Sequence, residues 1–216
     1  MKIQRSLSWK LLQTLVRPFA VLFFDLKIYG SHHIPPDGGV LIVSNHQSLL
    51  DPILLPLHLR RPLNFIAKSE LFSNRVFAWF LRSILNAFPV RQGQGDVRAV
   101  KETIQRLQEG HLMNIFPEGA RTLDGEIAPL LGGVALIIER AKVVVVPAVI
   151  VGAYDAWPIH RKFFRRRPVR IEFGPPMELV GLDRDETLAA IDGRLRHMFQ
   201  ELRAKDRPAS WKNGAA

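Results

Sequence analysis

The feature of this sequence that most constrains its fold is a series of short apolar runs separated by segments with helical periodicity. The longest run, 143–151, is typical of a strand that is buried on both faces of a sheet. Shorter runs predict further strands at 40–43, 64–67, 112–116 and 169–173. The segments between them predict helices at 70–87, 97–109, 134–141 and 184–205. This alternation predicts an α/β fold with a mostly parallel or mixed central sheet flanked by helices.

The length and composition predict one main folded domain. The 216 residues contain 47% hydrophobic residues, which is enough for a sizeable core, and no linker divides the chain. We expect a domain at 29–205, an N-terminal segment at 1–28 and a frayed tail at 206–216. The absence of cysteine excludes disulfides, thiolate metal sites and a cysteine nucleophile.

The N-terminal segment contains an apolar stretch, 11–24, that is interrupted by Gln13, Arg17 and Pro18. It is shorter than the roughly 18 uninterrupted apolar residues of a membrane-spanning helix, and no cleavage site of a signal peptide follows it. One interpretation is a core helix capped by a basic turn. The other is a helix that lies in a bilayer interface without crossing the bilayer, which its N-terminal position and adjacent phenylalanines favour.

The net charge of +10 points to an anionic partner, either nucleic acid or an acidic membrane surface. The segment 161–170, RKFFRRRPVR, contains six cations and two phenylalanines. Nucleic-acid binding would leave the apolar N-terminal stretch without a role, so we expect an anionic membrane surface as the partner and no nucleic acid. The alternative for 161–170 is an ordinary solvated basic loop.

A histidine and an aspartate follow the predicted strand 40–43, in the segment SNHQSLLDP. Functional groups of α/β sheets gather beyond the carboxyl ends of strands. If a helix begins after His46, Asp51 can return beside the imidazole and fix its tautomer, which leaves the other nitrogen free to take a proton from an alcohol. Alternatively, His46 completes a hydrogen bond at the strand end and Asp51 caps a helix before Pro52.

A second polar segment, FPEGAR at 116–121, follows the predicted strand 112–116. The arginine of this turn offers a planar set of donors suited to phosphate or carboxylate, and Gly119 permits close approach of a ligand to the backbone. The alternative is a surface turn with a local ion pair. Arg91, in PVRQ, follows an apolar helix and precedes a glycine-rich turn, which by itself is a weak indication of function.

Taken in order, NHQSLLD, FIAKSELF with PVRQ, FPEGAR and VVVVPAVIVG resemble the glycerolipid acyltransferases that act on 1-acylglycerol-3-phosphate. The resemblance covers roughly 29–178 and implies that 29–205 is an acyltransferase domain. It implies that His46 and Asp51 are the catalytic pair and that Arg91 contacts phosphate. It also implies that the acceptor site contains Phe116, Pro117, Glu118, Gly119 and Arg121. The proline of the fourth block corresponds to Pro147.

The resemblance further implies transfer of a fatty acyl group from acyl-CoA or acyl carrier protein to the sn-2 hydroxyl of 1-acylglycerol-3-phosphate, giving phosphatidic acid. Because a thioester is already activated, we expect no cofactor and no metal. The adjacent His32 and His33 cannot easily converge on one ion. A lysophospholipid acceptor in a membrane implies a peripheral or monotopic protein on the cytoplasmic face of the cell membrane.

Because of two departures from the family pattern, the sequence does not determine which lipid is the acceptor. Ala120 stands where the family usually has threonine, and Leu131 stands where a lysine is often found. The same chemistry on another lysophospholipid, a glycolipid or an aminolipid is therefore the alternative. A serine hydrolase is a weaker one, because Ser48 lies near His46 but no G-x-S-x-G elbow occurs.

Overall fold

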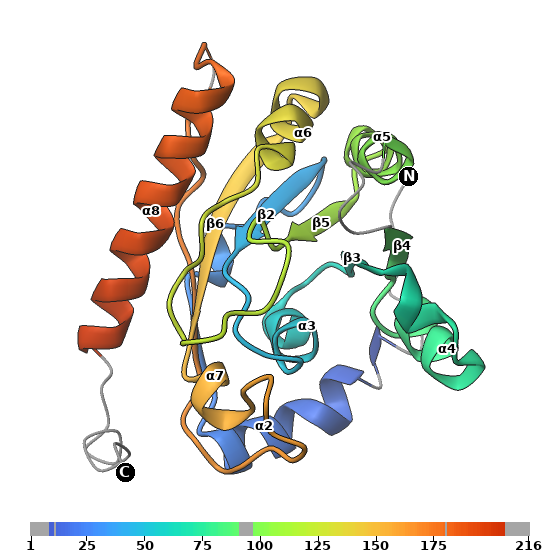
Figure 1. The fold of residues 1–216 in the computed structure, drawn as a ribbon, viewed down its shortest axis with the longest axis vertical. Coiled ribbons are helices and arrows are strands. Elements are labelled where there is room, and N and C mark those ends of the chain that lie inside the picture. Colours follow the sequence, from blue (N-terminus) through green and yellow to red (C-terminus); the bar gives the residue numbers. More distant parts are fainter. Residues whose placement is uncertain (1–8, 11, 91–96, 180, 206–216) are drawn as a thin grey trace.

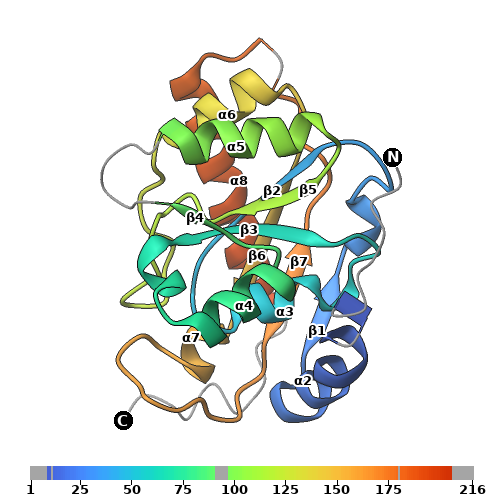
Figure 2. The same cartoon turned by 90° about the vertical axis from the view of Figure 1, so that its right-hand side faces the viewer.

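The computed structural model describes residues 9–10, 12–90, 97–179 and 181–205. In this part of the chain, seven strands form one sheet in the order β1-β7-β6-β2-β5-β3-β4, with helices on both faces (Figures 1 and 2). The strands are β1 (Lys27–Tyr29), β2 (Val40–Ser44), β3 (Leu63–Lys68), β4 (Phe88–Val90), β5 (Leu112–Ile115), β6 (Val144–Val151) and β7 (Arg170–Phe173). The neighbouring pairs β6–β2, β2–β5, β5–β3 and β3–β4 are parallel. Strand β7 is antiparallel to β6 and parallel to β1. The prediction of a mixed α/β sheet is therefore confirmed.

The helices form two layers, each of which covers one apolar cluster. One face of the sheet packs against α5 (Val97–Gln108), α6 (Gly133–Ala141) and α8 (Arg184–Lys205). The other face packs against α2 (Arg17–Phe24), α3 (Asp51–Leu54) and α4 (Arg75–Ser83). Shorter helical segments are η1 (Leu12–Val16), η2 (Ser31–His33), η3 (Leu55–His58), η4 (Ser69–Phe72) and α7 (Ala153–Ala156). Residues of β6 contribute to both clusters, as expected for a strand buried on both faces.

The predicted helix at 70–87 is wrong in its extent, because this segment contains η4, α4 and a chain reversal before β4. Asn74 restarts the helix, since its side-chain oxygen accepts hydrogen bonds from the N–H groups of Val76 and Phe77. Asn86 has a left-handed backbone (φ 46°), which helical residues do not adopt. Pro89 then lies in the edge strand, where a residue without an N–H group is tolerated.

The N-terminal segment forms η1 and α2, which are attached to the rest of the fold. Ala20 and Phe24 are buried in the same apolar cluster as α3 and α4, whereas Leu22 is 75% exposed. Arg170 of β7 is fully buried and forms an ion pair of 2.6 Å with Asp25, directly after α2. Among the helices of the described residues, none has the length and apolar character needed to cross a membrane.

Candidate active site

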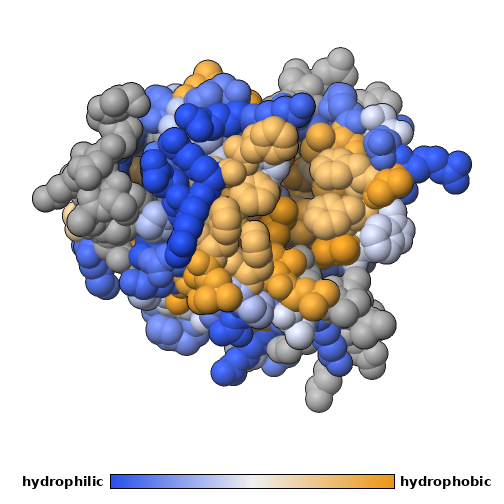
Figure 3. All heavy atoms as spheres, turned by 90° about the horizontal axis from the view of Figure 1, so that it is seen from below, coloured by the Kyte–Doolittle hydropathy of each residue, from blue (hydrophilic) through white to orange (hydrophobic). Residues whose placement is uncertain are grey.

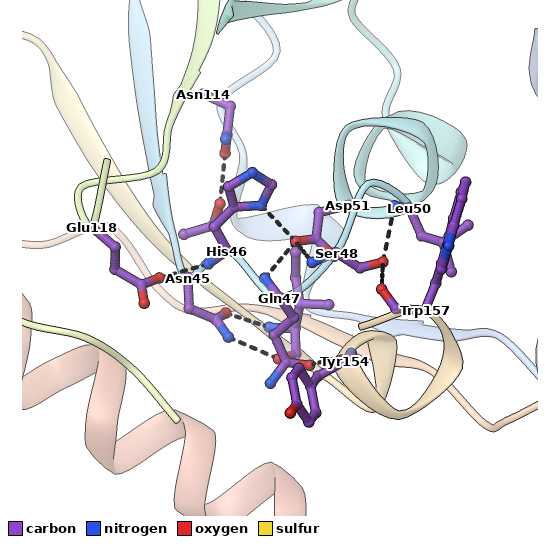
Figure 4. A network of polar contacts seen from close by, with 12 residues as sticks. Asn45, His46, Gln47, Ser48, Leu50, Asp51, Asn114, Glu118, Tyr154 and Trp157 are labelled. Atoms are coloured by element: carbon purple, nitrogen blue, oxygen red, sulfur yellow. Dashed lines mark hydrogen bonds and ion pairs between the residues drawn. The ribbon is translucent and has the colours of Figure 1, made fainter. Parts of the chain in front are cut away.

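The loop that follows β2 ends in α3 and brings Asp51 back beside His46. The Nδ1 atom of His46 lies 2.8 Å from Oδ2 of Asp51 (Figure 4). Because a carboxylate only accepts hydrogen bonds, the proton of a neutral imidazole belongs on Nδ1, and Nε2 keeps a free lone pair. The predicted pairing of histidine and carboxylate is therefore confirmed, and its geometry suits a general base.

Asp51 also fixes the backbone of the loop. Its Oδ2 atom accepts hydrogen bonds from the N–H groups of Gln47 (2.6 Å) and Ser48 (2.8 Å) in addition to the imidazole. The side chain is fully buried, and its Oδ1 atom has no hydrogen-bond partner within the described part of the chain. A single carboxylate oxygen thus binds both the backbone of the loop and the imidazole of His46.

Asn45 explains why the chain leaves the sheet just before His46. Ser44 pairs with Ala148 in the last step of the β2–β6 ladder. The side chain of Asn45 then replaces the backbone of a strand, since it donates to the C=O of Ile150 (2.9 Å) and accepts from its N–H (2.7 Å). The backbone at His46 is thereby free to turn toward α3.

The segment after β5 covers the imidazole and the loop. The ring of Phe116 stacks on that of His46, with a centroid separation of 3.9 Å and an angle of 14° between the planes. Pro117 is buried, and its carbonyl accepts a hydrogen bond from the N–H of Leu131. Phe116 and Pro117 offer no polar side-chain group, so they shape the site by packing.

Both carboxylate oxygens of Glu118 bind backbone groups. Oε1 accepts from the N–H of His46 (2.6 Å), and Oε2 accepts from the N–H of Ala128 (2.8 Å). Burial raises the pKa of Glu118 to about 7, with a further rise from the charge of Asp51, although both hydrogen bonds lower it. Glu118 therefore connects the histidine loop to the segment 126–128.

Arg121 is a half-buried cation beside this network. It forms no hydrogen bond or ion pair with other residues in the described ranges. Partial burial lowers the pKa of Arg121, while the negative charge of Asp51 acts in the opposite direction. A guanidinium that has lost part of its hydration in this way is suited to bind an anionic ligand.

Gly119 is required at the turn between Glu118 and Arg121. Its φ of 72° is unfavourable for other residues, and an added Cβ would lie 2.6 Å from a side-chain carbon of Leu131. Leu131, at the position where the family often has lysine, thus packs over this turn.

Arg91, the other predicted phosphate contact, lies outside the described residues. Among the residues that the structure describes, no three histidine or acidic side chains are grouped so that they could hold a metal ion.

Comparison with known proteins identifies the family of the chain. A sequence profile of the acyltransferase family matches residues 25–151, which include both polar segments of the site. The chain belongs to the acyltransferase family. Within this acyltransferase, the matched region ends at the last residue of β6 and so includes Pro147, which pairs with Val43 in the sheet.

Three relatives of this acyltransferase show how far the likeness extends. The 1-acyl-sn-glycerol-3-phosphate acyltransferase of Bacillus subtilis (strain 168) is 32% identical over 184 residues, 83% of this chain and 89% of that protein. The protein of the same name from Streptococcus pneumoniae (strain ATCC BAA-255 / R6) is 28% identical over 82% of this chain and 64% of its own length. The crystal structure of the 1-acyl-sn-glycerophosphate (LPA) acyltransferase PlsC from Thermotoga maritima matches with a TM-score of 0.78 and 30% identity, covering 91% of this chain and 80% of that chain.

Sequence reasoning missed several residues that hold the acyltransferase site together. Gln47 donates to the C=O of Gly125 and accepts from the N–H of Tyr154, which links the histidine loop to α7. Ser48 donates to the C=O of Trp157, so its hydroxyl is used to fix the loop. The signal in the sequence that could have identified them was the run of polar residues directly after an apolar strand. Polar groups that are buried there must find hydrogen-bond partners.

Proposed function

We propose that this acyltransferase transfers a fatty acyl group from acyl-CoA or acyl carrier protein to the sn-2 hydroxyl of 1-acylglycerol-3-phosphate, giving phosphatidic acid. The observation that supports it most is the contact of His46 Nδ1 with a buried carboxylate, which leaves Nε2 free as a base. The acceptor is the one named for the relatives from Bacillus subtilis and Streptococcus pneumoniae.

In the proposed reaction, Nε2 of His46 takes the proton of the acceptor hydroxyl while its oxygen attacks the thioester carbonyl. Asp51 stabilises the imidazolium that forms and keeps the ring in place. The tetrahedral intermediate then expels the thiolate, which receives the proton from the imidazolium. The products are an ester and a free thiol, and no covalent acyl-enzyme or cofactor is required.

The proposed phosphate ligand on the described part of the chain is Arg121. Its guanidinium follows the turn at Gly119, close enough to Asp51 for their charges to interact. Arg91 is proposed as a second phosphate contact on the resemblance alone. Glu118 is proposed as a positioning residue, since its oxygens are already occupied by backbone groups.

We further propose that the chain binds an anionic membrane as a peripheral or monotopic protein on the cytoplasmic face. Support comes from the contact between the two segments that the sequence suggests for this role. Phe164, in the basic loop 157–167, packs its ring 5.6 Å from that of Phe23 and 5.8 Å from that of Phe24 of α2. Phe163 beside it is 74% exposed, and the loop exposes Arg161, Lys162 and Arg166. Apolar and cationic groups are thus presented together, as anionic leaflets require.

The test is a transfer assay in detergent with labelled oleoyl-CoA or palmitoyl-CoA and a panel of lysolipids, repeated with acyl carrier protein thioesters. We expect labelled phosphatidic acid from lysophosphatidic acid. Product from a different lysolipid alone would support the proposed acyl transfer but show that the acceptor is that lysolipid. No product with either donor class would contradict the proposed function.

A further inference from the structure

Helix α4 has two apolar faces, one of which has no protein partner in the described structure. Its inner face buries Ala78 and Leu81 against the sheet. On the outer face, Val76 is 78% exposed and Trp79 is 61% exposed, and Phe77 at its edge is 40% exposed. Large apolar side chains gathered in this way on a surface mark an interaction site rather than ordinary solvent exposure.

The charges around this face are nearly all positive. Arg75 and Arg82 flank the exposed valine and tryptophan on α4, and Lys68 is exposed just before η4. Glu70 is the only acidic residue in the sequence of segment 68–90. Tryptophan between arginines is typical of the headgroup region of a bilayer, where the indole is half apolar and the cations meet lipid phosphate.

Helix α4 lies in the same lower half of the molecule as α2 and the basic loop (Figures 1 and 2). Figure 3 views the molecule from below and shows a broad apolar area that is hollowed in its middle and bordered by hydrophilic side chains. The N-terminal helical segment exposes the apolar residues Leu15, Phe19 and Leu22. Residues of α2 and α4 also pack against one common apolar cluster, so the two helices are held in a fixed arrangement.

We propose that the outer face of α4 inserts into the same anionic leaflet as α2, as a second and separate membrane contact. This inference rests on the proposed function, because a lipid acceptor must enter the site from a bilayer. Two contacts on one face would fix the tilt of the domain on the membrane, whereas α2 alone would act as a hinge. Positive charge around the face favours an anionic leaflet over an apolar protein partner.

The chain has no cysteine, so single labels can compare three positions. Val76→Cys tests α4, and Leu22→Cys tests α2. Val97→Cys is the matched control, since Val97 is an exposed valine (62%) at the start of α5, a helix of the opposite layer. Each variant receives a nitroxide, and its accessibility to oxygen and to a water-soluble relaxing agent is measured on phosphatidylglycerol–phosphatidylcholine vesicles.

We expect lipid-like accessibility at positions 76 and 22 and water-like accessibility at position 97. A water-like label at 76 with a lipid-like label at 22 would overturn this inference and keep membrane binding through α2. Water-like labels at both would overturn the membrane proposal itself. Immobilisation at 76 in lipid-free solution that grows with protein concentration would assign the face to a second copy and also overturn the inference.

A second measurement does not depend on labels. The double variant Val76→Ser, Trp79→Ser should lower the partition coefficient on anionic vesicles by about tenfold or more, because its apolar groups no longer enter the leaflet. Val97→Ser should leave partition unchanged. Because the substituted side chains are exposed, circular dichroism should show an intact fold, and equal partition of both variants would contradict the proposal.

Discussion

In the loop after β2, residues 45–51 are held by directional hydrogen bonds, whereas the outer face of α4 has exposed apolar groups with no fixed partner among the described residues. Asp51 alone accepts three hydrogen bonds in its loop. Trp79 and Val76 lie on helix α4 and are 61% and 78% exposed. A proton transfer depends on tenths of an ångström, while apolar burial in a lipid is nearly independent of direction. Substitutions should therefore separate the two regions: in the loop they should alter turnover, and on the apolar face they should alter membrane binding.

The largest effect is expected for His46→Ala. Removal of the proposed base should lower kcat by about 10²–10⁴-fold, with an unchanged circular dichroism spectrum. His197→Ala, at an exposed histidine of α8, is the control and should keep full activity. Retained activity in His46→Ala would show that His46 is not the base.

Asp51→Asn should have the next largest effect and lower kcat by about 10²-fold or more. The oxygen of an amide can take the place of Oδ2 and keep its three hydrogen bonds, but it carries no negative charge to stabilise the imidazolium. The substitution keeps the size of the side chain, so the melting temperature should change less than the activity. Asp37→Asn, at an exposed aspartate, serves as control. Activity close to that of the unmodified enzyme would show that the carboxylate charge is not needed.

Arg121→Ala should reduce kcat/KM by roughly 10–100-fold for an acceptor with a phosphate, mainly through KM. An acceptor of the same chain length that lacks the phosphate should be affected little. Arg121→Lys should recover part of the loss, because it restores the charge but not the planar donors. An equal loss for both acceptors would instead indicate a structural role for this side chain.

Glu118→Gln should change the pH dependence of stability. The pKa of Glu118 in the folded chain is about 7 against an ordinary value of 4.5, so the folded state holds the proton more tightly. Stability from this group is present below pH 4.5 and is lost as the pH rises to 7, by at most about 1.4 kcal/mol per pH unit. Denaturant titrations from pH 4.5 to 8 should give a flatter profile for the variant. An unchanged slope would show that Glu118 does not titrate in this range.

The smallest effect on turnover is expected for Phe163→Ser in the basic loop. Phe163 is 74% exposed and belongs to the basic loop, away from the proposed base and its hydrogen-bond partners in sequence, so activity on detergent-dispersed acceptor should be unchanged. Flotation with anionic vesicles should decrease a fewfold. Leu123→Ser, at another residue that is 74% exposed, is a control of matched exposure. Equal flotation of the two variants would exclude the basic loop from the membrane contact.

Local patterns in the sequence predicted much of the fold and the centre of the site. Apolar runs predicted β2, β3, β5, β6 and β7 within about two residues. The spacing of His46 and Asp51 permitted their contact, because five residues and one turn of helix can bring the two side chains together, and the resemblance to the family favoured this pairing over a helix cap. These features depend on neighbours along the chain.

The tertiary structure decided what depends on distant residues. The edge strands β1 and β4 are three residues each, too short for a sequence pattern, and exist because β7 and β3 supply backbone partners. Glu118 could be read as a substrate ligand until its oxygens were found to bind the backbone at His46 and Ala128. The exposed face of α4 was hidden in the apolar segment 70–87, because periodicity identifies apolar residues but not which of them the core will cover. Composition and spacing are properties of the chain, whereas burial and hydrogen-bond partners are fixed only when segments far apart in the sequence pack together.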